Sequence, residues 1–232
     1  MPFGSTPISP TQADHIFVLV AETQDETLFS VRRELPRSKS SQPQSLDAAL
    51  KALQKEIHLC IAEHARNHVF IHAGVVAWKN QTFVFPGFSH AGKSTLVWTL
   101  VQTGAVYFSD EYAVFDEQGR VHPFPLPIAL RAEHGARRMI MPDNIANSCR
   151  KADFIVFTRY RPDANWHPRL LQPATAMMRL VRHSIAIRAN PALVVPVLKQ
   201  VALQSKVFAG TRGQSKQLLH WLETVIIDPP IK

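Results

Sequence analysis

Apolar residues in this chain fall into short blocks, and their spacing changes along the sequence. Two blocks near the N-terminus, Ile16 to Ala21 and Thr27 to Glu34, are rich in Val, Ile and Phe and predict two strands. Residues 36–45 contain two prolines and four serines, a composition typical of a linker. We therefore expect an N-terminal strand hairpin and linker over residues 1–45, followed by a main domain over residues 46–232.

From residue 46 the pattern first becomes helical and then alternates between strands and helices. Leu46, Leu50, Leu53 and Ile57 recur every three or four residues, which predicts a helix that runs to about residue 67. The mixture that follows predicts an α/β domain. The expected strands are Val69 to Trp78, Gln81 to Pro86, Val106 to Phe108, Tyr112 to Asp116, Arg120 to His122 and Phe154 to Thr158. The expected helices are Lys93 to Thr103, Pro173 to Ser184, Pro191 to Ser205 and Gln214 to Val225.

Composition narrows the class of protein and its partners. The two cysteines are too few for a disulfide framework, and the N-terminus has no secretory signal pattern, so we expect a cytoplasmic protein. No apolar run approaches the roughly 20 residues of a membrane span, so we expect no membrane segment. The formal charge of +8 favours anionic partners. Because the arginines are spread along the sequence, we do not expect nucleic acid as the main partner.

One motif carries specific chemistry. The pattern G-x-x-x-x-G-K-[ST] follows an expected strand and precedes an expected helix, which is the context of a phosphate-binding P-loop. Backbone N–H groups of such a loop, together with the helix N-terminus, bind phosphate oxygens. The lysine reaches the β- and γ-phosphates and the serine ligates magnesium. The predicted nucleotide-binding residues are Gly87, Phe88, Ser89, His90, Ala91, Gly92, Lys93, Ser94 and Thr95.

Two carboxylates and a histidine are candidate partners of this loop. Asp110 and Glu111 follow an apolar strand downstream of Lys93, and phosphoryl transfer needs one acid for magnesium and another to accept a proton. His72 lies on a strand expected beside the P-loop strand, where it could tune a neighbouring carboxylate. His64 and His68 are spaced with His72 as in some zinc sites, but the strand expected from Val69 turns His72 away from them.

At these residues the sequence resembles the HPr kinase/phosphorylase superfamily, whose P-loop belongs to a fold shared with phosphoenolpyruvate carboxykinase. The matching elements are His72-Ala73-Gly74, the loop from Gly87 to Ser94, and Asp110-Glu111. Weaker similarity, from Pro123 to Arg131 and at Ser184, is to the smaller HPr kinase-related proteins, some of which phosphorylate serine in a peptide. We find neither the family's separate regulatory domain nor its phosphorolysis signature in this sequence. The resemblance therefore does not lead us to expect HPr as the substrate or phosphorolysis as a second reaction.

The resemblance implies magnesium-dependent transfer of the γ-phosphoryl group of ATP or GTP to a hydroxyl of a peptide, a protein or a small metabolite. It implies that Asp110 is the base beside His72, and that Glu111 and Ser94 hold the magnesium ion. Generic P-loop chemistry instead gives Asp110 to magnesium and Glu111 to the base. We expect the first assignment, with Arg131 as a further arginine on the phosphate side. Members of the family often form homo-oligomers.

A second hypothesis from a different class is a nucleotide-binding regulator or assembly subunit that uses the loop as a switch and transfers nothing. Acceptor-dependent turnover of nucleotide distinguishes the two hypotheses, because only a kinase consumes nucleotide faster when its acceptor is added.

Overall fold

The computed structural model describes residues 14–22, 25–35, 41–88, 92–131, 137–213 and 215–227. Its contacts divide the chain into two compact units, residues 1–61 and 62–232. The first unit contains the predicted hairpin, in which β1 (Ile16–Glu22) pairs antiparallel with β2 (Asp25–Leu35). A short third strand, β3 (Gln44–Ser45), pairs with β2 and leads directly into α1 (Leu46–His64).

The boundary between the two units lies after residue 61, later along the chain than the boundary at residue 45 that composition predicted. Most of α1 is grouped with the hairpin, because its residues up to 61 belong to the first unit. Residues 41–45, the described part of the predicted linker, therefore belong to the first unit together with most of α1.

The second unit is built on a mixed nine-stranded sheet, counted over the described residues. The strand order is β11-β8-β7-β4-β5-β12-β14-β13, and β6 pairs with β4 beside β7. β12 runs parallel to both β5 and β14, whereas the pairs that β4 makes are antiparallel. The strands are β4 (His68–Trp78), β5 (Gln81–Pro86), β6 (Val106–Ser109), β7 (Tyr112–Asp116), β8 (Arg120–His122), β11 (Arg150–Lys151), β12 (Phe154–Tyr160), β13 (Arg169–Leu170) and β14 (Lys206–Arg212).

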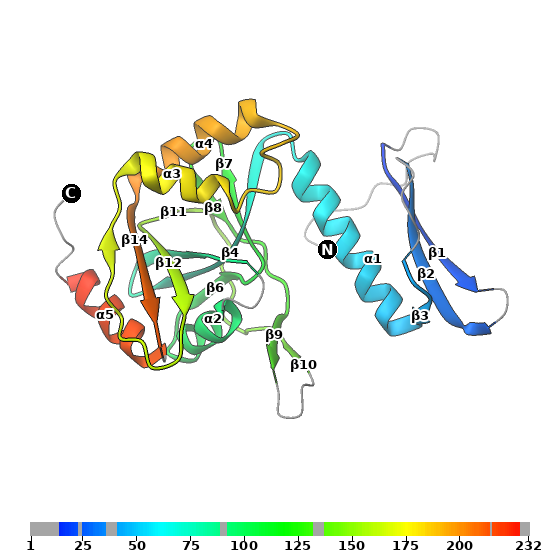
Figure 1. The fold of residues 1–232 in the computed structure, drawn as a ribbon, viewed down its shortest axis with the longest axis horizontal. Helices are drawn as coiled ribbons and strands as arrows, with labels where there is room; N and C mark the ends of the chain where they lie inside the picture. The colour runs from blue at the N-terminus through cyan, green and yellow to red at the C-terminus, as the bar shows by residue number, and fades with distance from the viewer. Residues whose placement is uncertain are drawn as a thin grey trace. The chain divides into compact units, whose positions relative to one another are not determined.

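Helices cover both faces of this sheet (Figure 1). Val75 of β4 faces a core that contains α3 (Pro173–Val181) and α4 (Pro191–Gln204). The next residue, Val76, faces a second core that contains α2 (Lys93–Gln102) and α5 (Ser215–Ile227). Successive strand residues point to opposite faces, so β4, which is buried on both sides, reads as a nearly continuous apolar run.

A separate two-stranded ribbon, β9 (Ile128–Arg131) paired with β10 (Arg137–Ile140), extends from the second unit. The sequence patterns predicted neither strand of this ribbon, and they also missed β11, β13 and β14. α4 continues through Pro196, which it accommodates inside the helix. Among the described residues, every helix is too short or too polar to cross a membrane.

Candidate active site

The P-loop residues lie between β5 and α2, as the sequence predicts. β5 ends at Pro86 and α2 begins at Lys93, with Gly92 at its N-cap in the left-handed conformation, φ 76° and ψ 19°. Ser89, His90 and Ala91 lie outside the described residues. The site therefore combines the end of a buried strand with the N-terminus of a helix, where the first N–H groups of the helix are available to bind an anion.

Lys93 and Ser94 open α2 and face the predicted carboxylates. Lys93 Nζ donates a hydrogen bond of 3.1 Å to the carbonyl of Phe88, within the loop. Burial lowers the pKa of Lys93, and the charges of Asp110 and Glu111 act in the opposite direction. Both acids thus lie close enough to the lysine to influence its charge. Thr95 is exposed on the outer side of α2, and its carbonyl accepts a hydrogen bond of 2.7 Å from Thr99.

Asp110 and Glu111 occupy a tight turn where the chain passes from β6 to β7. Ser109 Oγ accepts hydrogen bonds from the backbone N–H groups of Glu111, at 3.3 Å, and Tyr112, at 3.1 Å. Both strands pair with β4, so the turn lies opposite the middle of that strand. The N–H group of Ala73 donates to the carbonyl of Glu111 at 3.2 Å. This pairing fixes the two carboxylates next to His72 and the P-loop strand.

Asp110 is the buried acid of the pair. Only 7% of its surface is exposed, and its Oδ1 atom has no hydrogen-bond partner among the residues that the structure describes. Burial raises the pKa of Asp110 to about 6, against the effects of a hydrogen bond with Ser94 and the charge of Lys93. A buried carboxylate oxygen without a partner is costly, so this position is suited to a cation or a proton.

Gly74 leaves the space that Asp110 and α2 occupy. A Cβ atom at this position would come within 2.5 Å of Val97 on α2 and 3.7 Å of Asp110 Oδ1. The glycine in the motif His72-Ala73-Gly74 therefore has a packing explanation, because any side chain here would clash with Val97 of the helix that carries Lys93 and Ser94.

His72 lies beside Glu111, whereas the resemblance placed it beside Asp110. His72 Nδ1 is 3.8 Å from Glu111 Oε1, and the imidazole stacks on the ring of Tyr112 with 5.3 Å between centroids. Asp110 is instead associated with Ser94. The two acids point into different surroundings because they are successive residues of one turn, so the longer side chain reaches the histidine and the shorter one faces the helix.

His183, in the turn after α3, is a neighbour of the site that the sequence patterns did not select. α3 ends at Val181, short of its predicted end at Ser184, and the carbonyl of His183 accepts a hydrogen bond of 2.9 Å from His72 N–H. The imidazole lies 4.5 Å from the ring of Phe88, between centroids. Burial and the nearby charges of His72 and Lys93 lower the pKa of His183 to about 4, so its ring is neutral at pH 7.

Arg212 is a second residue that the patterns missed. It ends β14, and its guanidinium donates a hydrogen bond of 3.0 Å to the carbonyl of Gly92. A signal that could have found the strand is the short apolar run Val207-Phe208 between two predicted helices, but nothing in the sequence places the end of that strand near the P-loop. The other predicted arginine, Arg131, ends β9, and the position of its side chain lies outside the described part of the chain.

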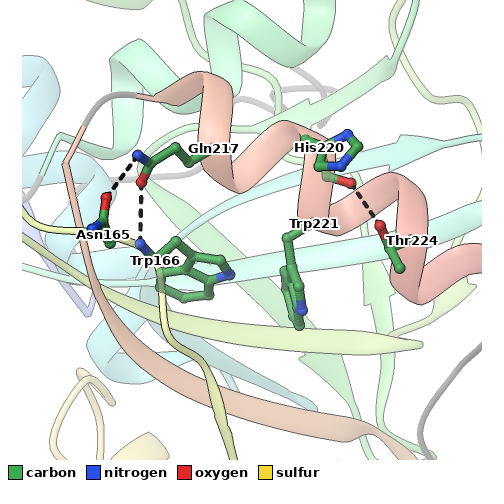
Figure 2. A pocket seen from close by; sticks show the side chains of 6 residues that line it. All are labelled: Asn165, Trp166, Gln217, His220, Trp221 and Thr224. Carbon is green, nitrogen blue, oxygen red and sulfur yellow. Dashed lines mark hydrogen bonds between the residues drawn. The ribbon is translucent and has the colours of Figure 1, made fainter.

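A shallow hollow of about 290 Å³ lies elsewhere, along α5 (Figure 2). The Gln217 side chain ties α5 to the segment before β13: it donates to Asn165 Oδ1 and accepts from the backbone N–H of Trp166, both at 3.1 Å. The lining of this hollow contains none of the candidate site residues that the sequence predicted. The residues that line it are Asn165, Trp166, Gln217, His220, Trp221 and Thr224.

Comparison with known proteins gives a distant structural likeness. No family model matches the chain, and no curated protein matches its sequence. The chain is similar to the Hpr(Ser) kinase/phosphatase from Coxiella burnetii, with a TM-score of 0.37 and 12% sequence identity over 68% of this chain and 94% of that one. A likeness this distant carries no conclusion about residues or activity, so function has to follow from the site itself.

Proposed function

We propose that this protein is a magnesium-dependent phosphotransferase that moves the γ-phosphoryl group of ATP or GTP to a hydroxyl, with the serine of a peptide or protein, or a small metabolite, as acceptor. The observation that supports the proposal is the position of Lys93 and Ser94, at the start of a helix, directly beside the buried Asp110. Phosphoryl transfer needs this combination of phosphate-binding cation and metal-binding oxygens at one place.

Ser94 and Asp110 fit a magnesium ion. Hydroxyl and carboxylate oxygens are the ligands that magnesium prefers, and the Oδ1 atom of Asp110 is buried with no hydrogen-bond partner among the described residues. A bound magnesium ion would neutralise charge that develops on the phosphate oxygens. Asp110 in this position stays ionised once the cation is present, because an opposite charge lowers the pKa that burial raises.

In this proposal Glu111 and His72 act on the acceptor side of the reaction. Glu111 leaves 49% of its side chain exposed, so an acceptor hydroxyl can reach it from solvent. In the proposed step the acceptor oxygen forms a bond to the γ-phosphorus, the bond between that phosphorus and the β,γ-bridging oxygen breaks, and the hydroxyl proton moves to Glu111. His72, 3.8 Å away, is close enough to orient that carboxylate. This assignment reverses the one that the resemblance implied for the two acids.

Transfer of labelled phosphate tests this function. We expect phosphate from γ-labelled ATP or GTP to appear on peptides encoded by neighbouring genes, and we expect Lys93→Ala to abolish the transfer. The same variant should weaken binding of triphosphate more than of diphosphate, since the lysine charge lies nearest the β- and γ-phosphates. Tight binding without acceptor-dependent turnover would support a nucleotide-binding regulator instead, and an unchanged transfer rate in Lys93→Ala would contradict the phosphotransferase.

A further inference from the structure

Arg212 joins the far end of the sheet to the P-loop. It is the last residue of β14 and only 3% of its surface is exposed. Its Nη2 atom donates a hydrogen bond of 3.0 Å to the carbonyl of Gly92, which lies 120 residues earlier in the sequence. The same carbonyl accepts the first hydrogen bond of α2, from Leu96 N–H at 3.2 Å. The guanidinium is therefore bound at the point where the phosphate-binding loop becomes a helix.

Gly92 is shaped for this contact. A Cβ atom at Gly92 would come within 2.5 Å of Arg212 Nη2, and the backbone has a φ of 76°, a value that favours glycine. The second glycine of the P-loop motif thus has two physical requirements in this protein. It adopts the left-handed conformation that precedes Lys93, and it leaves room for an arginine from another strand.

The surrounding backbone holds Arg212 in place. Nη1 lies 3.4 Å from the carbonyl of Gly213, to which it donates, and the carbonyl of Arg212 accepts a hydrogen bond of 2.9 Å from Arg161 N–H. Gly210, two residues earlier, leaves room for the indole of Trp166, since a Cβ atom there would come within 2.7 Å of it. Gln217 ties the Trp166 segment to α5 (Figure 2). Because its neighbours are fixed, the side chain of Arg212 needs little reorganisation when a ligand binds.

A cation at this place acts directly on the anion site. Electrostatic interactions at a given distance are stronger inside a protein than in water because the effective dielectric constant is lower, and a guanidinium remains charged at physiological pH. The backbone N–H groups that follow Gly92 are those that a P-loop uses for phosphate. A bound polyphosphate would thus meet two cations, the half-buried Lys93 from the loop itself and the buried Arg212 from behind Gly92.

We propose that Arg212 is a positioning residue of the phosphate site, which holds the carbonyl of Gly92 and adds its buried positive charge to that of Lys93. This inference rests on the proposed function, because it requires that the loop binds phosphate. It gives Arg212 two separable effects. The hydrogen bond fixes the loop before the ligand arrives, and the charge attracts the ligand.

The test compares Arg212→Met with the control Arg161→Met, which removes an exposed arginine from the neighbouring turn. Binding of MgATP, MgGTP and inorganic pyrophosphate is measured by calorimetry at several salt concentrations, together with the melting temperature without ligand. We expect Arg212→Met to bind all phosphate ligands roughly tenfold or more weakly and with a shallower dependence on salt, because one cation is lost. Arg161→Met should behave like the wild type in both measurements.

Further variants separate this role from a purely structural one. Arg212→Lys keeps the charge, so it should keep the wild-type salt dependence while binding more weakly than the wild type. If Arg212→Met does not fold, Arg212→Gln keeps a donor for Gly92 without the charge and gives the same comparison. Unchanged salt dependence in the uncharged variants would overturn the inference even if affinity falls with the melting temperature. Failure of the wild type to bind any of the three ligands would instead count against the proposed function.

Discussion

A buried aspartate lies at or next to each end of β7, and the two residues differ in the hydrogen-bond donors that surround them. Asp116, at the C-terminal end, is 6% exposed and accepts hydrogen bonds from the backbone N–H groups of Gln118 and Arg120, from Arg120 Nε and from His122 Nε2, all between 2.8 and 3.0 Å. Burial alone would raise the pKa of Asp116, but these hydrogen bonds bring it below its usual value.

Asp110, just before the N-terminal end of β7, has a similarly small exposed surface but leaves its Oδ1 atom without a hydrogen-bond partner among the described residues. Its pKa is raised to about 6. The two aspartates, both with little exposed surface, thus differ in two ways: hydrogen-bond donors lower the pKa of Asp116, whereas deeper burial raises the pKa of Asp110. Asp116 stabilises a turn, whereas Asp110 keeps capacity for a cation, and we interpret the first as a structural acid and the second as the acid of the proposed function.

The largest expected effect is on phosphoryl transfer and concerns Glu111, in the turn before β7. Glu111→Gln removes the proposed proton acceptor without changing its shape, so transfer should fall by roughly two to four orders of magnitude, the scale of general-base removal. Binding of magnesium nucleotide should be retained, because Ser94 and Asp110 are unchanged. Single-turnover transfer and equilibrium binding are measured separately. If Glu111→Gln loses magnesium dependence and Asp110→Asn loses only the rate, the roles of the two acids are reversed.

The second prediction concerns stability without nucleotide. Native Asp110 binds a proton up to about pH 6, whereas an unfolded aspartate releases it near pH 3.8, so the free energy of unfolding should fall as pH rises through this window. Asp110→Asn cannot titrate and should be more stable than the wild type at pH 7.5, by at most about 3 kcal/mol at 1.36 kcal/mol per pKa unit. Urea unfolding at pH 7.5 and pH 4 measures this. An equal difference at both pH values would contradict the account.

The third prediction concerns Asp116, at the C-terminal end of β7. Asp116→Ala leaves two backbone N–H groups of the turn without their acceptor, so it should lower the free energy of unfolding by about 1 to 3 kcal/mol. Loss of the Arg120 and His122 contacts should add little, because these two side chains are partly exposed and can be hydrated. The lowered pKa of Asp116 places this loss above pH 4, and it should diminish as the carboxylate of the wild type is protonated. Transfer activity measured well below the melting temperature should match the wild type, and a loss of activity there would remove the distinction between the two ends.

The smallest expected effect is on the magnesium requirement. Asp110→Asn replaces a charged oxygen ligand with a neutral one, so the magnesium concentration that gives half-maximal nucleotide binding should rise about tenfold, equivalent to 1.4 kcal/mol. The matched control is Asp116→Asn, which changes a buried aspartate at the other end of the same strand. Its magnesium titration should overlay that of the wild type, and equal shifts in both variants would show that the effect is not specific to the site.

The sequence predicted most of the elements that build the site, because local signals specify them. Apolar runs predicted β4 and β5, and the P-loop pattern predicted where α2 begins at Lys93. The sequence also predicted that β4 lies beside β5. The antiparallel pairing of the two strands confirms this, and the hydrogen bond from Gly87 N–H to the carbonyl of His72 extends it. The short strands β9, β11 and β13 were missed, since two to four residues carry no periodicity that distinguishes a strand from a loop.

By itself the sequence determined which residue types are available at the candidate site, because Gly92, Lys93 and Ser94 and their spacing are fixed covalently. Only the tertiary structure decided which acid meets which partner, and it assigned Asp110 to Ser94 and Glu111 to His72. It also brought Arg212 to the P-loop from 120 residues away. Such pairings depend on strand register and on the direction of each side chain, and burial then sets the pKa of the groups that meet, so no local pattern in the sequence contains them.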